Sequence, residues 1–494
     1  MTHAAADQSH SDASTLAVWG FAVSLATLGT AILFKASPGI NVGVWVACVV
    51  IAHVAVTRDR LGTVNAPTLA AGIWGVVLAF GIAVTTDGAR IAVLALAIFA
   101  LLTIALVTAG DSSLDILQPT LAVQAPFAAF AFVLSGATAQ ASGSVRTARS
   151  PTIASLVRAM LITIPLITVL IFLLAEADPM FAAARDVLEH IVPDDFVSRS
   201  FFFSILFAIT LGAYGGVQRG LITVHEQPRQ RGGSLGALER RSLTTSLAAV
   251  MWLFVASATV SLLKNPAAVA GSGVTYAEYV HRGFAELSVA ATLVIGATLA
   301  TRRSWISTDA WARRMAFAAI AGECAMITIA FMRVVRYEQA YGFTVLRLYA
   351  QAYMLVLACI SVLLFVEIAR RTQSTRFAYH SASAALIVLA SCVYWNTDAW
   401  IVRHNVDRYA ETGKIDLDYL MHDLSSDATP ELIASVPRLK LAEQSAIAGW
   451  LCDANYRRRP SDPRWFAWNA RASAAQAARR EWYSRSHSNC YPPS

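Results

Sequence analysis

The feature that most constrains this chain is a series of apolar runs, each about 20 residues long and able to span roughly 30 Å of hydrocarbon as a helix. Hydrophobic residues make up 56% of the 494 residues and charged residues only 14%. With a mean hydropathy of +0.53, a water-soluble globule would have too much apolar surface to bury. We therefore predict an all-α, polytopic transmembrane helical bundle. The expected spans lie near 16–34, 40–57, 66–85, 89–108, 119–137, 153–175, 200–223, 244–263, 283–301, 312–333, 345–368 and 377–395.

The number of spans is expected to be eleven or twelve. Pro119, Gln124 and Pro126 interrupt the fifth run, which therefore either crosses the membrane or lies in its interface. The spans together form a predicted transmembrane domain over residues 1–395. Residues 396–494 are more polar, and Gly413 is expected to stop a helix and Asp416 to cap the next segment, so we expect a small soluble helical domain there.

Basic residues indicate the orientation, because Lys and Arg concentrate in cytoplasmic connections. Every second connection in the later part of the chain is rich in arginine and is therefore expected to be cytoplasmic. The C-terminal domain then lies on the opposite side, outside the cytoplasm. The N-terminal side stays open: Arg58 and Arg60 favour a cytoplasmic N-terminus with eleven spans, whereas a tail with Asp7 and Asp12 but no basic residue favours twelve. The arginine-rich set comprises Arg146, Arg149, Arg219, Arg229, Arg231, Arg240, Arg241, Arg302, Arg303, Arg313, Arg314, Arg370, Arg371 and Arg376.

The net charge of +7 reflects these topology signals, so membrane lipid rather than nucleic acid is the expected partner. Of the six cysteines, only Cys452 and Cys490 lie in the polar C-terminal region. In an oxidising compartment they can form a disulfide, but two separate thiols are an equal alternative. No metal-binding spacing and no catalytic motif occurs, so neither a metal nor another cofactor is expected.

Polar residues gather at the predicted outer boundary of the ninth to eleventh spans. Charged groups there need pairing, hydration or a polar cavity. Arginine can hold a phosphate or carboxylate, and tyrosine can pack against a sugar or lipid chain. The alternative is structural, with Arg–Glu pairs fixing helix ends and tyrosines in the interfacial belt. The candidate residues are Tyr276, Glu278, Tyr279, Arg282, Arg333, Arg336, Tyr337, Glu338, Tyr341 and Arg347.

Glu323 falls near the middle of the predicted span 312–333. An intramembrane carboxylate is a functional candidate because a charge is costly at that depth. The alternative is a protonated carboxyl group that hydrogen-bonds a neighbouring hydroxyl and serves helix packing. This alternative is favoured because the other spans offer no basic partner near their middle.

Three segments carry a resemblance to a known family: TYAEYVHRGFAEL (275–287), YEQAYGFTVLR (337–347) and the region from Asn396 to Leu432. Together they resemble a bacterial membrane family known as domain of unknown function 4173. The resemblance implies a multi-pass protein of the bacterial cytoplasmic (inner) membrane and no assigned activity. It adds Asn396, Asp398, Asn405 and Arg408 to the candidate outer-face residues, although these residues can equally be caps and docking contacts.

Three classes of function remain open. The leading hypothesis is binding of a polar or anionic envelope component, a lipid headgroup or glycan intermediate, at the outer face in transport, assembly or sensing. The second is a membrane enzyme, such as a glycosyl or phosphoryl transferase on a lipid carrier, with Asp111, Asp115 or Glu278 as its acid. The third is a secondary transporter that uses the intramembrane carboxylate of Glu323.

Overall fold

The computed structural model contains helices and their connections, and no strand, over the residues that it describes. Seven of these helices are long and apolar enough to cross a membrane, and a bent helix pair is an eighth candidate. The prediction of an all-α, multi-pass membrane protein is thereby confirmed. The described residues are 2–109, 195–219, 237–263, 291–299, 301–302, 306, 308–371, 377–457 and 464–485.

Large apolar side chains lie on the outside of these helices. Leu16, Ile51, Leu96 and Leu253 are 67% to 76% exposed. Water would be a poor solvent for such surfaces, whereas the hydrocarbon core of a membrane is a good one. The fold therefore has the apolar exterior that a lipid-embedded bundle needs.

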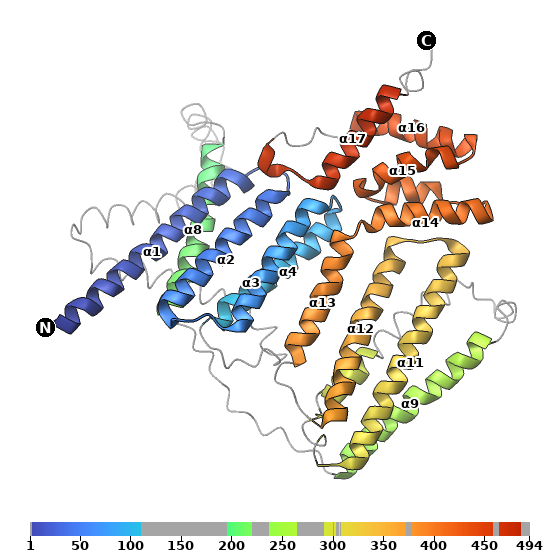
Figure 1. The fold of residues 1–494 in the computed structure, drawn as a ribbon, viewed down its shortest axis with the longest axis horizontal. Coiled ribbons are helices and arrows are strands. Elements are labelled where there is room, and N and C mark those ends of the chain that lie inside the picture. Colours follow the sequence, from blue (N-terminus) through green and yellow to red (C-terminus); the bar gives the residue numbers. More distant parts are fainter. Residues whose placement is uncertain are drawn as a thin grey trace, which may run out of the picture. The chain divides into compact units, whose positions relative to one another are not determined.

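The chain divides into two compact units, of which unit 1 comprises Met1–His225 and Arg459–Ser473. Its main helices lie side by side (Figure 1), and Leu25, Phe207 and Tyr214 contribute to a core that α1, α2, α4 and α8 share. The elements are α1 (Thr2–Leu33), α2 (Ile40–Leu61), α3 (Ala66–Gly81), the 3-10 turn η1 (Ile82–Val84), α4 (Gly88–Thr108), α8 (Phe196–Arg219) and the 3-10 turn η7 (Trp465–Ala467).

Unit 1 has two ends, which we name after a residue at each. At the Lys35 end, the turn between α1 and α2 meets the start of α8 through an ion pair between Lys35 and Asp195. At the Arg60 end, the guanidinium of Arg60 donates to the carbonyl of Val217, near the end of α8, at 2.5 Å. Helix α8 therefore runs from the Lys35 end to the Arg60 end.

A segment from the C-terminal region, residues 464–469, packs against the Lys35 end of unit 1. Arg464 donates to the backbone carbonyl of Lys35. Asn469 Nδ2 donates to the carbonyls of Ile82 and Thr85, each at 2.9 Å, in the connection between α3 and α4. One short segment thus joins the α1–α2 turn to the α3–α4 turn.

Gly39 allows this close approach. The N–H of Ile40 donates to the carbonyl of Trp468 at 3.0 Å. A Cβ atom on Gly39 would lie only 2.5 Å from that same oxygen, and backbone cannot easily move away. The absence of a side chain at Gly39 is therefore a condition for this contact.

Unit 2 comprises Glu226–Arg458 and Ala474–Ser494. Helix α11 has α9 and α12 as neighbours (Figure 1). A Cβ atom on Gly322 would lie 3.0 Å from the Met251 Cβ, which shows how closely α11 approaches α9. The elements are α9 (Ala237–Leu263), α11 (Ala310–Tyr341), α12 (Val345–Arg370), α13 (Phe377–Tyr394), α14 (Thr397–Thr412), the π-helical turn η4 (Tyr419–Asp423), the 3-10 turn η5 (Ser426–Ala428), α15 (Thr429–Ser435), the 3-10 turn η6 (Val436–Arg438), α16 (Leu441–Arg457) and α17 (Ala470–Arg485), whose first residues belong to unit 1.

The helices after α13 have an apolar core of their own. Helix α14 is bent by 65° from α13, and its Ile401 and Val406 are fully or almost fully buried together with Leu432 of α15 and Ile447 of α16. Gly413 adopts the left-handed conformation (φ +69°) that ends α14. This core explains why α14, although it follows α13 directly, packs with the C-terminal helices.

Several predicted spans are visible as helices. Those at 200–223, 312–333, 345–368 and 377–395 correspond to α8, α11, α12 and α13, and the first four correspond to α1–α4. The span at 244–263 lies within the longer α9, which is not among the seven candidates. The predicted spans 119–137 and 153–175 lie outside the described residues, as do 283–290 and 300 of the span at 283–301. The division at residues 395 and 396 stays a prediction.

Candidate functional site

The turn between α11 and α12 is held by a side chain from α14. Asn405 Nδ2 donates to the carbonyl of Phe343 at 2.9 Å, and its Oδ1 accepts from the N–H of Phe343 at 2.9 Å. The neighbouring Gly342 has φ +87°, and a Cβ atom there would collide with Asn405 Oδ1. The Asn405 amide can therefore occupy this position only because residue 342 is a glycine.

Arg408, one turn further along α14, binds the last turn of α11. Its Nε donates to the carbonyl of Gln339 at 2.9 Å, and another guanidinium nitrogen donates to the carbonyl of Ala340. The last carbonyls of a helix lack intrahelical donors and carry partial negative charge, so a guanidinium satisfies and stabilises them. Asn405 and Arg408 thus act as a clamp on the α11–α12 turn, and we refer to this pair as the α14 clamp.

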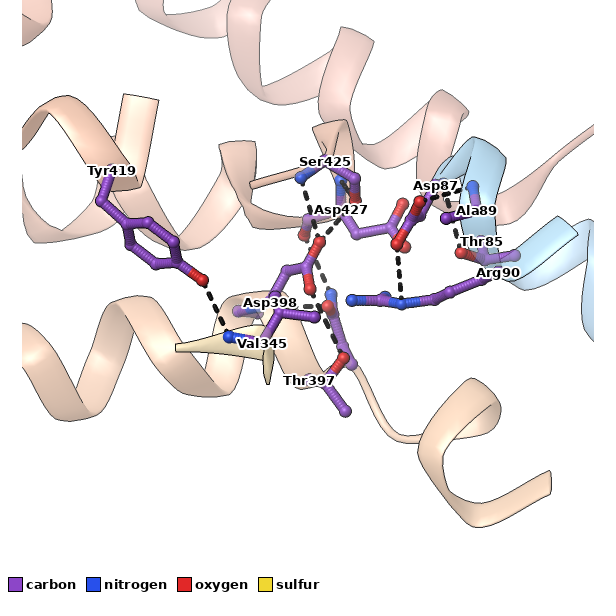
Figure 2. Close-up of polar contacts among 12 residues, drawn as sticks. Thr85, Asp87, Ala89, Arg90, Val345, Thr397, Asp398, Tyr419, Ser425 and Asp427 are labelled. Atoms are coloured by element: carbon purple, nitrogen blue, oxygen red, sulfur yellow. Dashed lines mark hydrogen bonds and ion pairs between the residues drawn. The ribbon is translucent and has the colours of Figure 1, made fainter. Parts of the chain in front are cut away.

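Tyr419 adds a third contact to the same turn. Its hydroxyl oxygen accepts a hydrogen bond from the N–H of Val345, the first residue of α12, at 2.8 Å (Figure 2). Burial raises the pKa of the Tyr419 hydroxyl above its usual range, against the lowering effect of this hydrogen bond. The phenol is therefore neutral at physiological pH and serves as an acceptor here.

Asp398 and Asn396 organise the beginning of α14. Asp398 is buried and accepts from the N–H of Ser425 at 3.1 Å and from the Ser425 hydroxyl at 2.6 Å (Figure 2). The Asn396 side chain caps α14 by accepting from the N–H of Ala399 at 3.1 Å, and it donates to the carbonyl of Asp427 at 3.0 Å. Both candidates therefore make the capping and docking contacts that the sequence offered as their alternative role.

The arginine and tyrosine candidates of α11 and α12 lie near this turn. The Tyr337 and Tyr341 rings are 4.6 Å apart, and the Arg347 guanidinium lies 4.4 Å from the centre of the Tyr337 ring. Arg347 also donates to the carbonyl of Gly342. Tyr341 is 54% exposed, so the group combines a fixed cation–π contact with an accessible aromatic ring.

Arg333 and Arg336 precede these tyrosines on α11. Arg333 is half-buried and Arg336 is exposed. They stand three residues apart, so they lie on neighbouring positions of one helix surface. Their spacing places two guanidinium groups within one turn of the Tyr337–Tyr341 pair.

Glu338 points into the contact between α11 and α12. It is 3% exposed, and its Oε2 accepts from Gln351 Nε2 at 2.6 Å. Its Oε1 has no hydrogen-bond partner among the described residues. Gln351 was not among the predicted site residues, because a lone glutamine in an apolar run gives no distinctive signal.

Glu323 lies deeper on the same helix. Its side chain is completely buried, and the hydroxyl of Ser361 on α12 donates to its Oε1 at 3.1 Å. Its Oε2 has no hydrogen-bond partner among the residues that the structure describes. The hydroxyl that the packing interpretation required is thus present, but it serves only one of the two oxygens.

The opposite end of α11 and α12 carries ion pairs. Asp309 caps α11 by accepting from the N–H groups of Trp311 and Ala312, at 3.0 and 3.2 Å, and it accepts from Arg241 Nε at 3.0 Å. The hydrogen bond from Ala312 holds the pKa of the Asp309 carboxyl below its usual value; Arg241 adds to this effect, whereas burial opposes it.

A second ion pair at that end is almost entirely buried. Arg302 and Glu367 are 2.6 Å apart, with each side chain 7% exposed. The Arg302 guanidinium also lies 4.8 Å from the centre of the Phe377 ring. These contacts satisfy charges that would otherwise destabilise the bundle.

Two groups of candidates reach beyond the described part of the chain. Tyr276, Glu278, Tyr279 and Arg282 lie outside it, as does Cys490. Cys452 is disulfide-bonded, whereas Cys48, Cys324, Cys359 and Cys392 are not in a disulfide. The pairing of Cys452 with Cys490 stays a prediction. Among the described residues, no group of three or more His, Cys, Asp or Glu side chains is arranged to hold a metal ion.

A family model described as a domain of unknown function, DUF4153, matches residues 70–435. The resemblance to domain of unknown function 4173 therefore named the wrong family, although the expectation of a family without an assigned function was correct. Short motifs and a shared plan of apolar helices separate related membrane families poorly, which explains the error. Comparison with curated proteins and with solved structures gives no match.

Proposed function

We propose that this chain, which belongs to the DUF4153 family, binds a polar or anionic envelope component at the α11–α12 turn. A lipid headgroup or a glycan intermediate fits the chemistry there. The family description assigns no activity, so the proposal depends on the contacts of the described residues.

The observation that carries the proposal is the group of basic and aromatic side chains at one fixed helix end. Arg336 and Tyr341 are exposed there, while Tyr337 contacts both the Tyr341 ring and the Arg347 guanidinium. A guanidinium can donate two parallel hydrogen bonds to phosphate or carboxylate. Tyrosine rings favour the headgroup level of a membrane. The α14 clamp reduces the conformational freedom of this helix end, which lowers the entropic cost of binding.

We place this end of unit 2 outside the cytoplasm of the bacterial inner membrane. The disulfide at Cys452 supports an oxidising compartment for the C-terminal helices. Arg240, Arg241 and Arg302 support a cytoplasmic location for the opposite end of α11, following the positive-inside tendency.

This orientation also determines where the N-terminus lies. Residues 458–463 separate α16 from Arg464, and six residues extend at most about 22 Å, less than the roughly 30 Å of hydrocarbon. The segment 464–469 is therefore on the same side as α16, and it binds the Lys35 end of unit 1. The Lys35 end is then outside and the N-terminus cytoplasmic, in agreement with the eleven-span alternative and with Arg58 and Arg60.

Binding is tested by measuring association of the purified protein with lipid vesicles that contain phosphatidylglycerol or only phosphatidylcholine. We expect R336Q to weaken association with the anionic vesicles severalfold. R370Q removes the same charge from the opposite end of the bundle and is the matched control. Equal effects of the two variants, or no preference of the wild type for anionic lipid, would overturn the proposal.

Sidedness is tested separately by single cysteines at Ser37 and Thr63, in a variant in which the four cysteines that are not in a disulfide are replaced. A membrane-impermeant maleimide should label the cysteine at Ser37 in intact cells, but the cysteine at Thr63 only after lysis. The reverse pattern would exclude a cytoplasmic N-terminus.

A further inference from the structure

We propose that Glu323, Ser361 and Thr298 form a proton-binding site inside the membrane, with the Glu323 carboxyl group as the proton carrier. This inference goes beyond binding at the α11–α12 turn and uses none of the residues there. It concerns three polar side chains buried in the helix bundle of unit 2.

The depth of Glu323 is the first step. It lies 13 residues after Ala310 and 18 residues before Tyr341 on α11, so it is near the middle of a helix that is long and apolar enough to cross a membrane. Its side chain is completely buried. A carboxyl group at such a position is neutral unless a cation accompanies it, because the hydrocarbon does not solvate a charge.

The hydrogen bonding of Glu323 is the second step. Ser361 donates to Oε1, which leaves Oε2 as the atom that carries the proton of the neutral acid. Oε2 has no hydrogen-bond partner among the described residues. A carboxylic acid that only joined two helices would use its O–H as a donor to a hydroxyl or carbonyl group. Glu323 instead keeps its proton-bearing oxygen available.

The groups around Glu323 supply no permanent counter-charge among the described residues. The neighbouring titratable group on its own helix is the Cys324 thiol. Helix α9 approaches this level with Met251 and Trp252. On α12 the charged residue closest in sequence to Ser361 is Glu367, which is paired with Arg302. A proton is therefore the cation that allows the site to stay neutral.

Thr298 is the third member, and its level follows from two contacts that the helical residues 291–299 and 301–302 make with α12. Thr292 contacts Tyr353 at 3.2 Å, and Arg302 contacts Glu367 at 2.6 Å. Along its own helix, Thr298 lies six tenths of the way from Thr292 to Arg302. Ser361 lies at nearly the same fraction along α12, so the two residues are at a similar level of their helices.

Thr298 is 2% exposed, and its Oγ1 also has no hydrogen-bond partner among the described residues. Two buried oxygen atoms without partners thus occur at the level of one serine hydroxyl. Buried polar groups without partners are uncommon and indicate strain, a ligand or a role in proton exchange. Four side-chain oxygens are fewer than the six to eight that a hard metal cation such as Ca²⁺ takes, whereas a proton needs only the carboxyl group and its neighbours.

The site does not continue along the helix to Glu338. Met326, Ile327, Ala330 and Val334 lie between the two glutamates on α11 and are buried apolar residues. Glu338 also differs in its contacts, because it accepts from Gln351 near the α11–α12 turn. It therefore serves as an internal comparison for Glu323.

The test uses dicyclohexylcarbodiimide, an apolar reagent that reacts with protonated carboxyl groups in membrane proteins. The purified full-length protein in detergent is labelled across a pH series, and peptide mass spectrometry locates and quantifies the adduct. We expect an adduct on Glu323 that falls about tenfold from neutral to alkaline pH, as its proton is lost. E323Q should remove this adduct, and E338Q should leave it unchanged.

Three results would overturn the proposal. The first is no adduct on Glu323 at any pH while the protein stays folded. The second is an adduct that does not change with pH, which indicates a permanently protonated packing residue. The third is suppression of the adduct by NaCl at constant pH, which indicates a sodium site. Because the labelling is read on the wild-type protein, the test remains decisive even if E323Q does not fold.

Discussion

The side-chain amide of Asn405 hydrogen-bonds both backbone polar groups of Phe343, at 2.9 Å in each direction, across 62 residues of sequence. This pairing attaches α14 to the turn between two long apolar helices. We expect N405L to destabilise the protein by about 2 to 4 kcal/mol, because it leaves one backbone N–H and one carbonyl without partners. Thermal unfolding in detergent measures this loss.

N405D and E411Q refine that experiment. N405D keeps an acceptor for the Phe343 N–H but loses the donor to its carbonyl, so we expect an intermediate loss. Glu411 is exposed on the same helix, and E411Q should change stability by less than about 0.5 kcal/mol. An N405L variant as stable as E411Q would show that the pairing contributes nothing to the folded state.

Gly342 provides a second prediction. Its φ of +87° is unfavourable for any residue with a side chain, and an added Cβ atom would collide with Asn405 Oδ1. We expect G342A to lower stability by roughly 1 to 3 kcal/mol. Gly449 in α16 has open space around it, so G449A should stabilise the helix by up to about 1 kcal/mol. Changes of the same sign in the melting temperatures of both variants would contradict this explanation.

The cap at the start of α11 predicts a pH dependence. Folding lowers the pKa of the Asp309 carboxyl below its ordinary value of 3.8. The charged carboxylate therefore stabilises the folded protein at pH values above that ordinary pKa. That stabilisation is lost as the pH falls through the lowered folded pKa. Asparagine also caps helices, so D309N should keep the cap and lose only the charge.

The stability difference between wild type and D309N should therefore be larger at pH 7 than at about pH 3, the region of an ordinary carboxyl titration. Melting temperatures at the two pH values measure it. A difference that is independent of pH would mean that the Asp309 charge does not contribute to stability.

The disulfide at Cys452 gives a chemical prediction. Alkylation of denatured but unreduced protein should leave Cys452 unmodified and should modify Cys359, which is free. Reduction before alkylation should expose Cys452. Peptide mass spectrometry distinguishes the two cases, and modification of Cys452 without reduction would argue against an extracytoplasmic C-terminal region.

The local features of the fold were predictable from the sequence because they depend on neighbouring residues. Helix α12 was expected at 345–368 and runs over Val345–Arg370, since a run of apolar residues needs a helix to cross hydrocarbon. Gly413 was expected to stop a helix and does so with a positive φ. Asp416 was expected to begin the next segment, and it accepts from the N–H of Tyr419 at 3.0 Å.

The long-range contacts were not predictable in this way. Asn405 and Arg408 were candidates for ligand binding or for docking contacts, and the sequence did not identify the α11–α12 turn as the segment that they hold. Asn469 was not singled out, although it binds the α3–α4 connection from almost four hundred residues away. Nothing in the spacing of a polar residue identifies a backbone carbonyl in a distant turn as its partner.

The sequence by itself determined that the chain is helical and membrane-embedded, because backbone polar groups in lipid can be satisfied only within regular structure. It also located Glu323 within a span. Only the tertiary structure decided that Ser361 donates to one oxygen of this carboxyl group and that the other oxygen is left without a partner among the described residues. The reason is that hydrophobicity acts along each segment, whereas the pairing of a buried polar atom depends on which helices pack together and in which register.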